Sequence, residues 1–141
     1  GAAAVVLSRE SVAKENGQMP VAKIVGLAAH AQEPSEFTVA PVGAINKLLE
    51  QTGWSADDVD LWEVNEAFAC VAMFAMRDIG IPHDKINVNG GGTALGHPIG
   101  ASGTRIIVTL LNALKQQGKK RGIASLCIGG GEATAVAVEM V

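Results

Sequence analysis

The strongest constraint in the sequence is an alternation between short apolar runs and longer segments with helical periodicity. Apolar runs typical of strands cover residues 2–7, 21–29, 59–64, 86–88, 123–128 and 133–140. Helical segments separate most of them, at residues 8–16, from residue 41 to the glycine at 53, from residue 65 or 66 to about 78, and from the end of a glycine-rich stretch to the glycine at 118. This order predicts a layered α/β domain with a mostly parallel sheet, to which the last two runs add a hairpin and one antiparallel strand.

The first apolar run, Ala2 to Leu7, resembles the middle of a buried strand although it stands at the start of the chain. It lacks the initiator Met, the charged n-region and the cleavage site of a signal peptide. We therefore expect the chain to be a piece of a longer protein, with its first residues the end of a preceding segment.

Length, charge and cysteine content exclude several classes of protein. The 141 residues suit one domain, and no stretch approaches the roughly 20 apolar residues of a membrane span. The net charge is -3 and no basic patch points to nucleic acid or a membrane surface. Cys70 and Cys127 lie far apart in apolar surroundings, so we expect free thiols in a reducing compartment. No Cys or His pair has the spacing of a metal site.

The glycine-rich stretch from Asn89 to Gly103 is the first candidate for a functional site. Its glycines allow close approach of the backbone to a ligand, and Pro98 holds the preceding His97 in an extended conformation. A helix then begins, and its free N–H groups favour negative charge. His97 is therefore a candidate general base or oxyanion donor, the alternative being a solvated His in a glycine-rich turn. No dinucleotide-binding fingerprint, P-loop or nucleophile elbow fits the sequence.

Cys127 and Asn65 are the other candidates. Cys127 ends an apolar run and precedes three glycines whose N–H groups could form an anion hole, or it is a small core residue. Cys70 lies within a helical segment among Ala and Val, which favours the core. Asn65 stands at a strand-to-helix junction, where a helix N-cap is the first interpretation and an amide that positions water is the second.

Three motifs, in this order and at this spacing, resemble those of the thiolase family. They are its Asn-Glu-Ala-Phe motif, its Gly-His-Pro block and its C-terminal Cys-glycine block, which stand here as Asn65-Glu66-Ala67-Phe68, Gly96-His97-Pro98-Ile99-Gly100-Ala101-Ser102-Gly103 and Cys127-Ile128-Gly129-Gly130-Gly131. The likeness extends through the linking segments and covers nearly the whole chain. It implies a C-terminal thiolase domain over residues 1–141, without the N-terminal half, and a thiolase-like layered α/β/α fold around a mixed five-stranded sheet.

The resemblance implies reversible acyl transfer through a covalent acyl-cysteine, by ping-pong steps. One direction is Claisen condensation of two acyl-CoA units, and the other is thiolysis of a 3-ketoacyl-CoA. His97 would activate the nucleophilic Cys and help to bind a thioester oxygen. Cys127 would act as general acid and base, and Asn65 would hold a water that shares an oxyanion site with His97.

The resemblance also implies contacts on the substrate side. The N–H of Gly129 would contribute to a second oxyanion site, and Ala67 and Phe68 would line the pantetheine tunnel. Acyl-CoA and CoA would be the partners, with no metal and no bound cofactor. The full-length protein would be a homodimer or homotetramer, cytoplasmic or, in a eukaryote, in the mitochondrial matrix or peroxisome.

The sequence departs from the family in two places and lacks its nucleophile. Gly91-Gly92-Thr93-Ala94 stands where the family usually has Gly-Gly-Ala-Ile-Ala, and Glu132-Ala133 stands where many members have Gln-Gly or Met-Gly. These changes leave substrate preference open. Neither Cys70 nor Cys127 matches the nucleophile's motif, so we expect this chain alone to be inert. The alternative is a non-catalytic domain for assembly or acyl-CoA binding; the Cys-glycine block disfavours a ketoacyl synthase relative.

Overall fold

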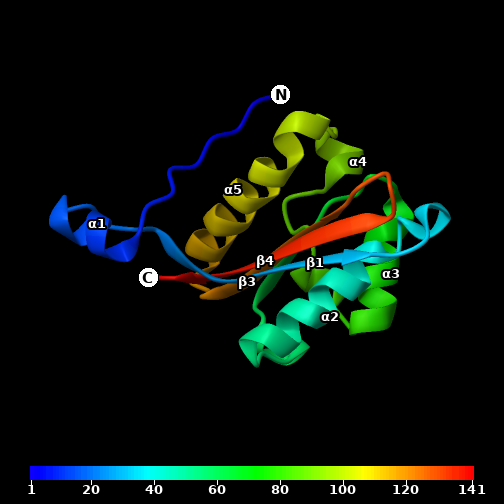
Figure 1. The fold of residues 1–141 in the computed structure, drawn as a ribbon, viewed down its shortest axis with the longest axis horizontal. Helices are drawn as coiled ribbons and strands as arrows, with labels where there is room; N and C mark the ends of the chain where they lie inside the picture. The colour runs from blue at the N-terminus through cyan, green and yellow to red at the C-terminus, as the bar shows by residue number, and fades with distance from the viewer.

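The computed structural model covers residues 1–141, and helices and strands alternate along most of its length (Figure 1). The longer elements are α1 (Glu10–Glu15), β1 (Ala22–Ala31), α2 (Ala40–Thr52), β2 (Leu61–Val64), α3 (Ala69–Ile79), α4 (Gly92–Leu95), α5 (Ile99–Gln117), β3 (Arg121–Cys127) and β4 (Glu132–Met140). Single-turn 3-10 helices cover Pro34–Glu36, Ala56–Asp58 and His83–Lys85. No helix combines the length and the apolar character needed to cross a membrane.

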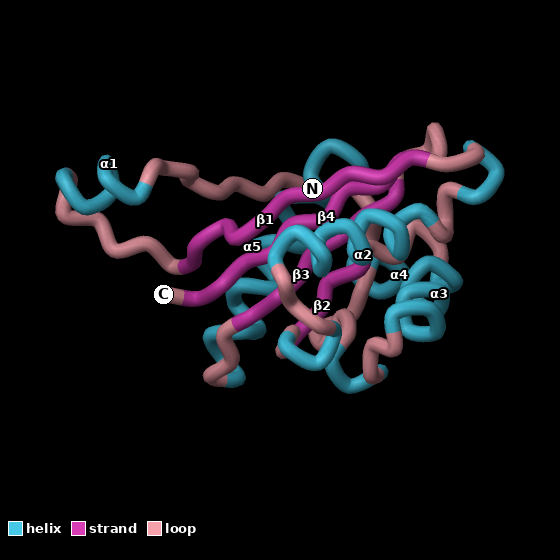
Figure 2. Tube along the Cα trace, turned by 60° about the horizontal axis from the view of Figure 1, so that its bottom comes forward, coloured by secondary structure: helices cyan, strands magenta, loops and turns pink.

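The strands form one mixed sheet in the order β1-β4-β3-β2 (Figure 2). β4 pairs antiparallel with both β1 and β3, while β2 pairs parallel with β3. Three strands therefore run in the same direction and β4 alone runs against them. The expectations of a mixed sheet and of a C-terminal antiparallel hairpin are confirmed.

The sheet has four strands, so the prediction of five is wrong. Residues 86–88 form only an isolated bridge between Ile86 and Trp62. The next residue, Asn87, has a φ of 48°, in the left-handed region, which ends the extended backbone. Its side chain supplies the hydrogen bonds that a neighbouring strand would give to Val64. Oδ1 accepts from the Val64 N–H and Nδ2 donates to the Val64 carbonyl, each at 2.9 Å.

The apolar run at residues 2–7 is likewise not a strand of this sheet. It has no regular structure, and Val6 and Leu7 are 94% and 73% exposed. The segment runs outside the sheet toward α1, which is shorter than the predicted helix at residues 8–16 (Figure 1). A strand requires a neighbour for its backbone N–H and C=O groups, and no strand of the chain pairs with this run.

Helices cover both faces of the sheet, which gives the predicted α/β/α layers (Figure 2). α2 and α3 pack on one face in an apolar cluster that includes Ile45, Val71 and Trp62. α5 packs on the other face, over Leu61 and Ala124. Alternate residues of β2 and β3 point to opposite helices, so each short strand contributes to both clusters.

α5 lies close against β3 because the strand offers a glycine at the contact. A Cβ added to Gly122 would fall 2.8 Å from Cδ1 of Leu110, which is fully buried on α5. The Leu110 side chain of α5 thus packs directly on the backbone of β3 at Gly122. The helix ends at Gly118, whose φ of 64° suits a glycine.

One charged pair lies between the sheet and α5. Glu63, in the middle of β2, is almost fully buried, and its Oε2 accepts a hydrogen bond of 3.3 Å from the Arg105 guanidinium. Burial raises the pKa of Glu63 to about 7, because the loss of hydration outweighs the attraction of Arg105, and the nearby Glu66 adds to the rise.

Truncation of Leu110 tests the α5 packing. Leu110→Ala should lower the free energy of unfolding by about 2–5 kcal/mol, since it removes buried methyl groups and leaves a cavity over Gly122. Leu27→Ala is the matched control, because Leu27 on β1 is 63% exposed. Urea unfolding of both variants would measure the difference. Equal losses at the two positions would contradict the role of Leu110 in the core.

The raised pKa of Glu63 makes stability depend on pH. Between about pH 4.5 and 7 the unfolded chain releases the Glu63 proton while the folded chain keeps it, so the stabilising contribution present below pH 4.5 is lost as the pH rises through 7. Relative to wild type, Glu63→Gln should gain up to ~3 kcal/mol of unfolding free energy between pH 4.5 and pH 8. Urea unfolding at both pH values measures this gain. Glu33→Gln, at an exposed site, should show no such gain, and a flat response for Glu63→Gln would refute the prediction.

Candidate active site

The candidate site lies where β2 and β3 end. The two strands are parallel and in register, with Val64 opposite Ser125, and the Asn65 N–H donates to the Ser125 carbonyl at 2.9 Å. Their carboxyl ends therefore meet at the same edge of the sheet. This edge brings together Asn65, which follows β2, and Cys127, the last residue of β3, as expected for a site in an α/β fold.

Asn65 is not a helix cap, so the first interpretation of this residue is wrong. α3 begins at Ala69, and the extended residue at its N-cap is Phe68. Asn65 is instead 1% exposed, and its side chain turns into the molecule toward His97. The helix starts after a non-helical segment, in which Phe68 is extended and the Glu66 side chain bonds to Thr93 and Asn87.

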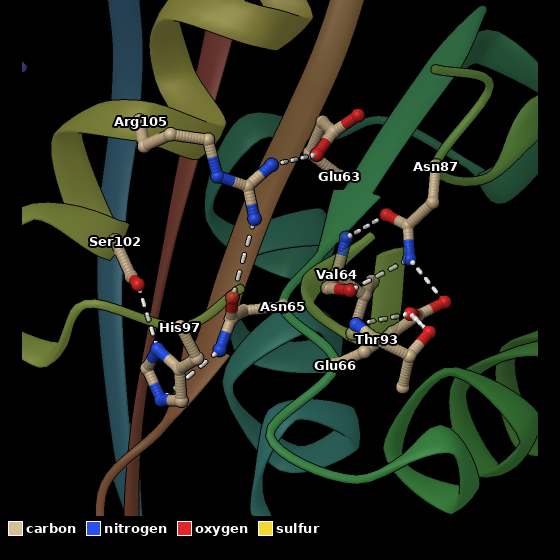
Figure 3. Close-up of polar contacts among 9 residues, drawn as sticks. All are labelled: Glu63, Val64, Asn65, Glu66, Asn87, Thr93, His97, Ser102 and Arg105. Atoms are coloured by element: carbon tan, nitrogen blue, oxygen red, sulfur yellow. Dashed lines mark hydrogen bonds and ion pairs between the residues drawn. The ribbon is translucent and has the colours of Figure 1, made fainter. Parts of the chain in front are cut away.

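Glu66 joins the segment after β2 to the glycine-rich stretch (Figure 3). Its carboxylate accepts hydrogen bonds from the N–H (3.1 Å) and the hydroxyl of Thr93, and from Nδ2 of Asn87 at 3.3 Å. Burial acts to raise the pKa of Glu66, but these hydrogen bonds and Arg105 hold it below the usual range. A side chain at Gly91 or Gly92 would collide with Glu66, which explains why glycines stand there.

His97 is half-buried and has a hydrogen-bond partner at each ring nitrogen (Figure 3). Nδ1 lies 2.6 Å from Oγ of Ser102, and Nε2 lies 3.4 Å from Nδ2 of Asn65. The Ser102 hydroxyl donates to the Pro98 carbonyl at 3.1 Å, so Oγ is left to accept from Nδ1–H. This assigns the proton of the neutral ring to Nδ1 and leaves the Nε2 lone pair facing Asn65.

Cys127 is 8% exposed, and its side chain packs in the apolar cluster under α2 and α3. Burial raises the pKa of its thiol, and the nearby Cys70 adds to the rise. No hydrogen bond joins it to His97, and no cation of the chain offsets the burial. The structure therefore brings Cys127 to the edge of the sheet without the help that nearby charge would give a thiolate.

The remaining predicted residues surround this edge. Gly129 lies in the exposed turn between β3 and β4, and its N–H donates to no acceptor of the chain. Phe68 is 57% exposed and meets Phe37 edge to face, with ring centroids 6.1 Å apart. Ala67 is half-buried beside it. No cluster of ligand side chains that could hold a metal ion is present.

Three residues that orient the site were missed as functional residues. Ser102 orients the His97 ring, and Arg105 donates both to Glu63 and, at 3.4 Å, to Oδ1 of Asn65. Two signals were available in the sequence. Arg105 is the only Lys, Arg, Asp or Glu between Lys85 and Lys115, and Glu63 is the only charge in the run from Leu61 to Val64.

The arrangement combines a base with preorganised donors. The Nε2 lone pair can accept a proton, after which Nε2–H and the Asn65 amide N–H both donate toward the space between them. Two donors that share one acceptor are suited to stabilise a developing oxyanion. The unpaired N–H of Gly129 offers another donor along the same edge.

Comparisons with known proteins identify the family of the chain. The family model described as "Thiolase, C-terminal domain" matches residues 18–140. The chain is 50% identical over 139 residues to an acetyl-CoA acetyltransferase of Allochromatium vinosum, covering 99% of this chain and 35% of that protein. It is 48% identical over 139 residues to the cytosolic acetyl-CoA acetyltransferase of Mus musculus, with the same coverage.

A solved structure shares the fold. The crystal structure of human mitochondrial 3-ketoacyl-CoA thiolase in complex with CoA superimposes with a TM-score of 0.91 at 42% identity, over 94% of this chain and 33% of that one. The chain thus spans about a third of the length of these relatives. The family match, the sequence identity and the shared fold together show that this chain belongs to the thiolase family, as its C-terminal domain.

Proposed function

We propose that the full-length protein is an acyl-CoA C-acyltransferase that catalyses Claisen condensation of acetyl-CoA and the reverse thiolysis of 3-ketoacyl-CoA. The observation that carries this proposal is the contact between Asn65 and His97, in which an amide and an imidazole of fixed orientation face each other at 3.4 Å. The names of the relatives, acetyl-CoA acetyltransferase and 3-ketoacyl-CoA thiolase, support the same reaction.

The nucleophilic Cys would come from the part of the protein outside this chain. His97 would accept its proton at Nε2, since Ser102 keeps the ring proton on Nδ1. The thiolate would attack the thioester carbonyl, and CoA would leave as the acyl-cysteine forms. Nε2–H would then donate to a thioester oxygen, together with a water held by the Asn65 amide, so that negative charge on that oxygen is stabilised.

Cys127 would move the second proton. In condensation its thiolate would remove a proton from the α-carbon of acetyl-CoA, and in thiolysis it would take the proton of the CoA thiol. Burial raises the pKa of Cys127, so its thiolate would be a strong base but a minor species near neutral pH. The N–H of Gly129 would contribute to a second oxyanion site.

CoA thioesters would be the substrates, with Ala67 and Phe68 along the pantetheine tunnel, and no metal or bound cofactor would be needed. The exposed Phe68 ring offers an apolar surface for this purpose. The CoA complex of the human thiolase supports the ligand. The full-length protein would be a homodimer or homotetramer. It would lie in the cytoplasm or, in a eukaryote, in the mitochondrial matrix or peroxisome, and the relatives include a cytosolic and a mitochondrial protein.

Replacement of His97 tests the central role. In the full-length enzyme, His97→Ala should lower kcat for thiolysis of acetoacetyl-CoA by about 10²–10⁴-fold, because the nucleophile loses its base. The matched control is His83→Ala, at an exposed position in the turn His83–Lys85, which should leave kcat unchanged. Near-normal turnover by a folded His97→Ala enzyme would refute the assignment.

The chain alone provides a second test. The purified 141-residue chain should show no thiolysis of acetoacetyl-CoA, followed as loss of the enolate absorbance after CoA is added, since it lacks the nucleophile. Clear turnover that disappears in Cys127→Ala would show that Cys127 acts as nucleophile, and its assignment as general acid and base would be wrong.

A further inference from the structure

Arg105 links a buried carboxylate to the candidate active site (Figure 3). From α5 its guanidinium donates through one terminal nitrogen to Oε2 of Glu63 at 3.3 Å and through the other to Oδ1 of Asn65 at 3.4 Å. The side chains of Arg105 and Glu63 are only 18% and 2% exposed. The guanidinium is thus held between Glu63, within β2, and Asn65, the first residue after that strand.

The contact with Arg105 decides which end of the Asn65 amide faces His97. The two ends of an amide are nearly equal in size, but only the oxygen accepts and only the nitrogen donates. A guanidinium has no acceptor, so Oδ1 must face Arg105. Nδ2 is therefore directed at Nε2 of His97.

We propose that Arg105, anchored by Glu63, is a positioning residue that keeps the Asn65 amide nitrogen, and not its oxygen, directed at the oxyanion side of His97. The inference rests on the proposed function. If the amide were reversed, Oδ1 would accept from protonated Nε2 and would repel a developing oxyanion. Arg105 touches no reacting atom and acts only through Asn65.

Burial of the Glu63–Arg105 pair supports this inference. A buried ion pair is often no more stabilising than an apolar pair of the same size, so packing alone does not account for it. A planar guanidinium can span two acceptors at once in a fixed geometry. A Lys ammonium at this position could hold Glu63 but could not hold both acceptors in the same arrangement.

The experiment uses the full-length enzyme and the conservative variant Arg105→Lys. This variant should lower kcat for thiolysis about 10–100-fold, because a misplaced group near the reaction centre carries a cost of this order, and KM for acetoacetyl-CoA should change little. Asn65→Ala should lower kcat on the order of 10²-fold. The double variant should be no slower than Asn65→Ala, since Arg105 acts only through the residue already removed.

Arg121→Lys is the matched control. Arg121 also pairs with a carboxylate, Glu139, but it lies at the far end of β3 from the site and should keep the wild-type kcat. If Arg105→Lys does not fold, Glu63→Gln replaces it, because this change leaves the guanidinium and weakens its anchor. Glu63→Gln should lower kcat in the wild-type background and have no effect in the Asn65→Ala background.

The outcomes separate this inference from the proposed function. The positioning role would be overturned by a wild-type kcat in a folded Arg105→Lys enzyme, or by a loss that adds fully to that of Asn65→Ala. In either case, slow His97→Ala and Asn65→Ala enzymes would still uphold the proposed function. Wild-type kcat in Asn65→Ala would overturn the role of Asn65 and this inference with it. A loss of kcat from Arg105→Lys or Glu63→Gln that appears only when Asn65 is present, and not in Asn65→Ala, would support the inference.

Discussion

The parallel hydrogen-bonded pairing of β2 with β3 is the contact on which the rest of the molecule depends. It joins segments that are 61 positions apart at the pair Val64 and Ser125, and it brings two carboxyl strand ends to one edge. Both strands are short and almost fully buried, because α5 covers one face and α2 and α3 cover the other. A shift of register by one residue would turn Glu63 away from Arg105 and move Asn65 off the edge.

The loops that complete the site are held by side-chain hydrogen bonds to buried or half-buried carboxylates. Glu66 ties the start of α4 to the end of β2, while Glu63 holds Arg105 behind Asn65. Ser102 then sets the ring of His97 from α5. Since each of these groups has a partner on a different element, the orientation of Asn65 and His97 follows from the packing of the domain and not from the local loop conformation alone.

The sequence predicted the elements whose signals are local. The periodic apolar residues of α5 and the glycine at its end, Gly118, gave its position, and the glycine turn after Cys127 gave the hairpin. The prediction of a strand at residues 86–88 was wrong because the apolar neighbours of Asn87 give no sign of its positive φ. The prediction of a strand at residues 2–7 was wrong because a strand forms only where another strand of the sheet pairs with it.

The site was predicted in part for the same reason. His97 and Asn65 belong to recognisable motifs, and the structure places their side chains together. The resemblance also named Cys127, Gly129, Ala67 and Phe68, and the roles of all six residues remain predictions. Glu63 and Arg105 belong to no motif and meet across 42 positions of sequence, so their relation to Asn65 required the fold.

The position of β4 has a consequence for how the domain forms. Of the four strands β1 is made first and β4 last, yet β4 lies between β1 and β3 and pairs with β1 along its length, from Ala22 opposite Met140 to Ala31 opposite Glu132. During synthesis, the edge of β1 that pairs with β4 therefore has no partner in this sheet until β4 has been made. Such long-range pairing slows folding, and an open strand edge is a site at which other chains can associate.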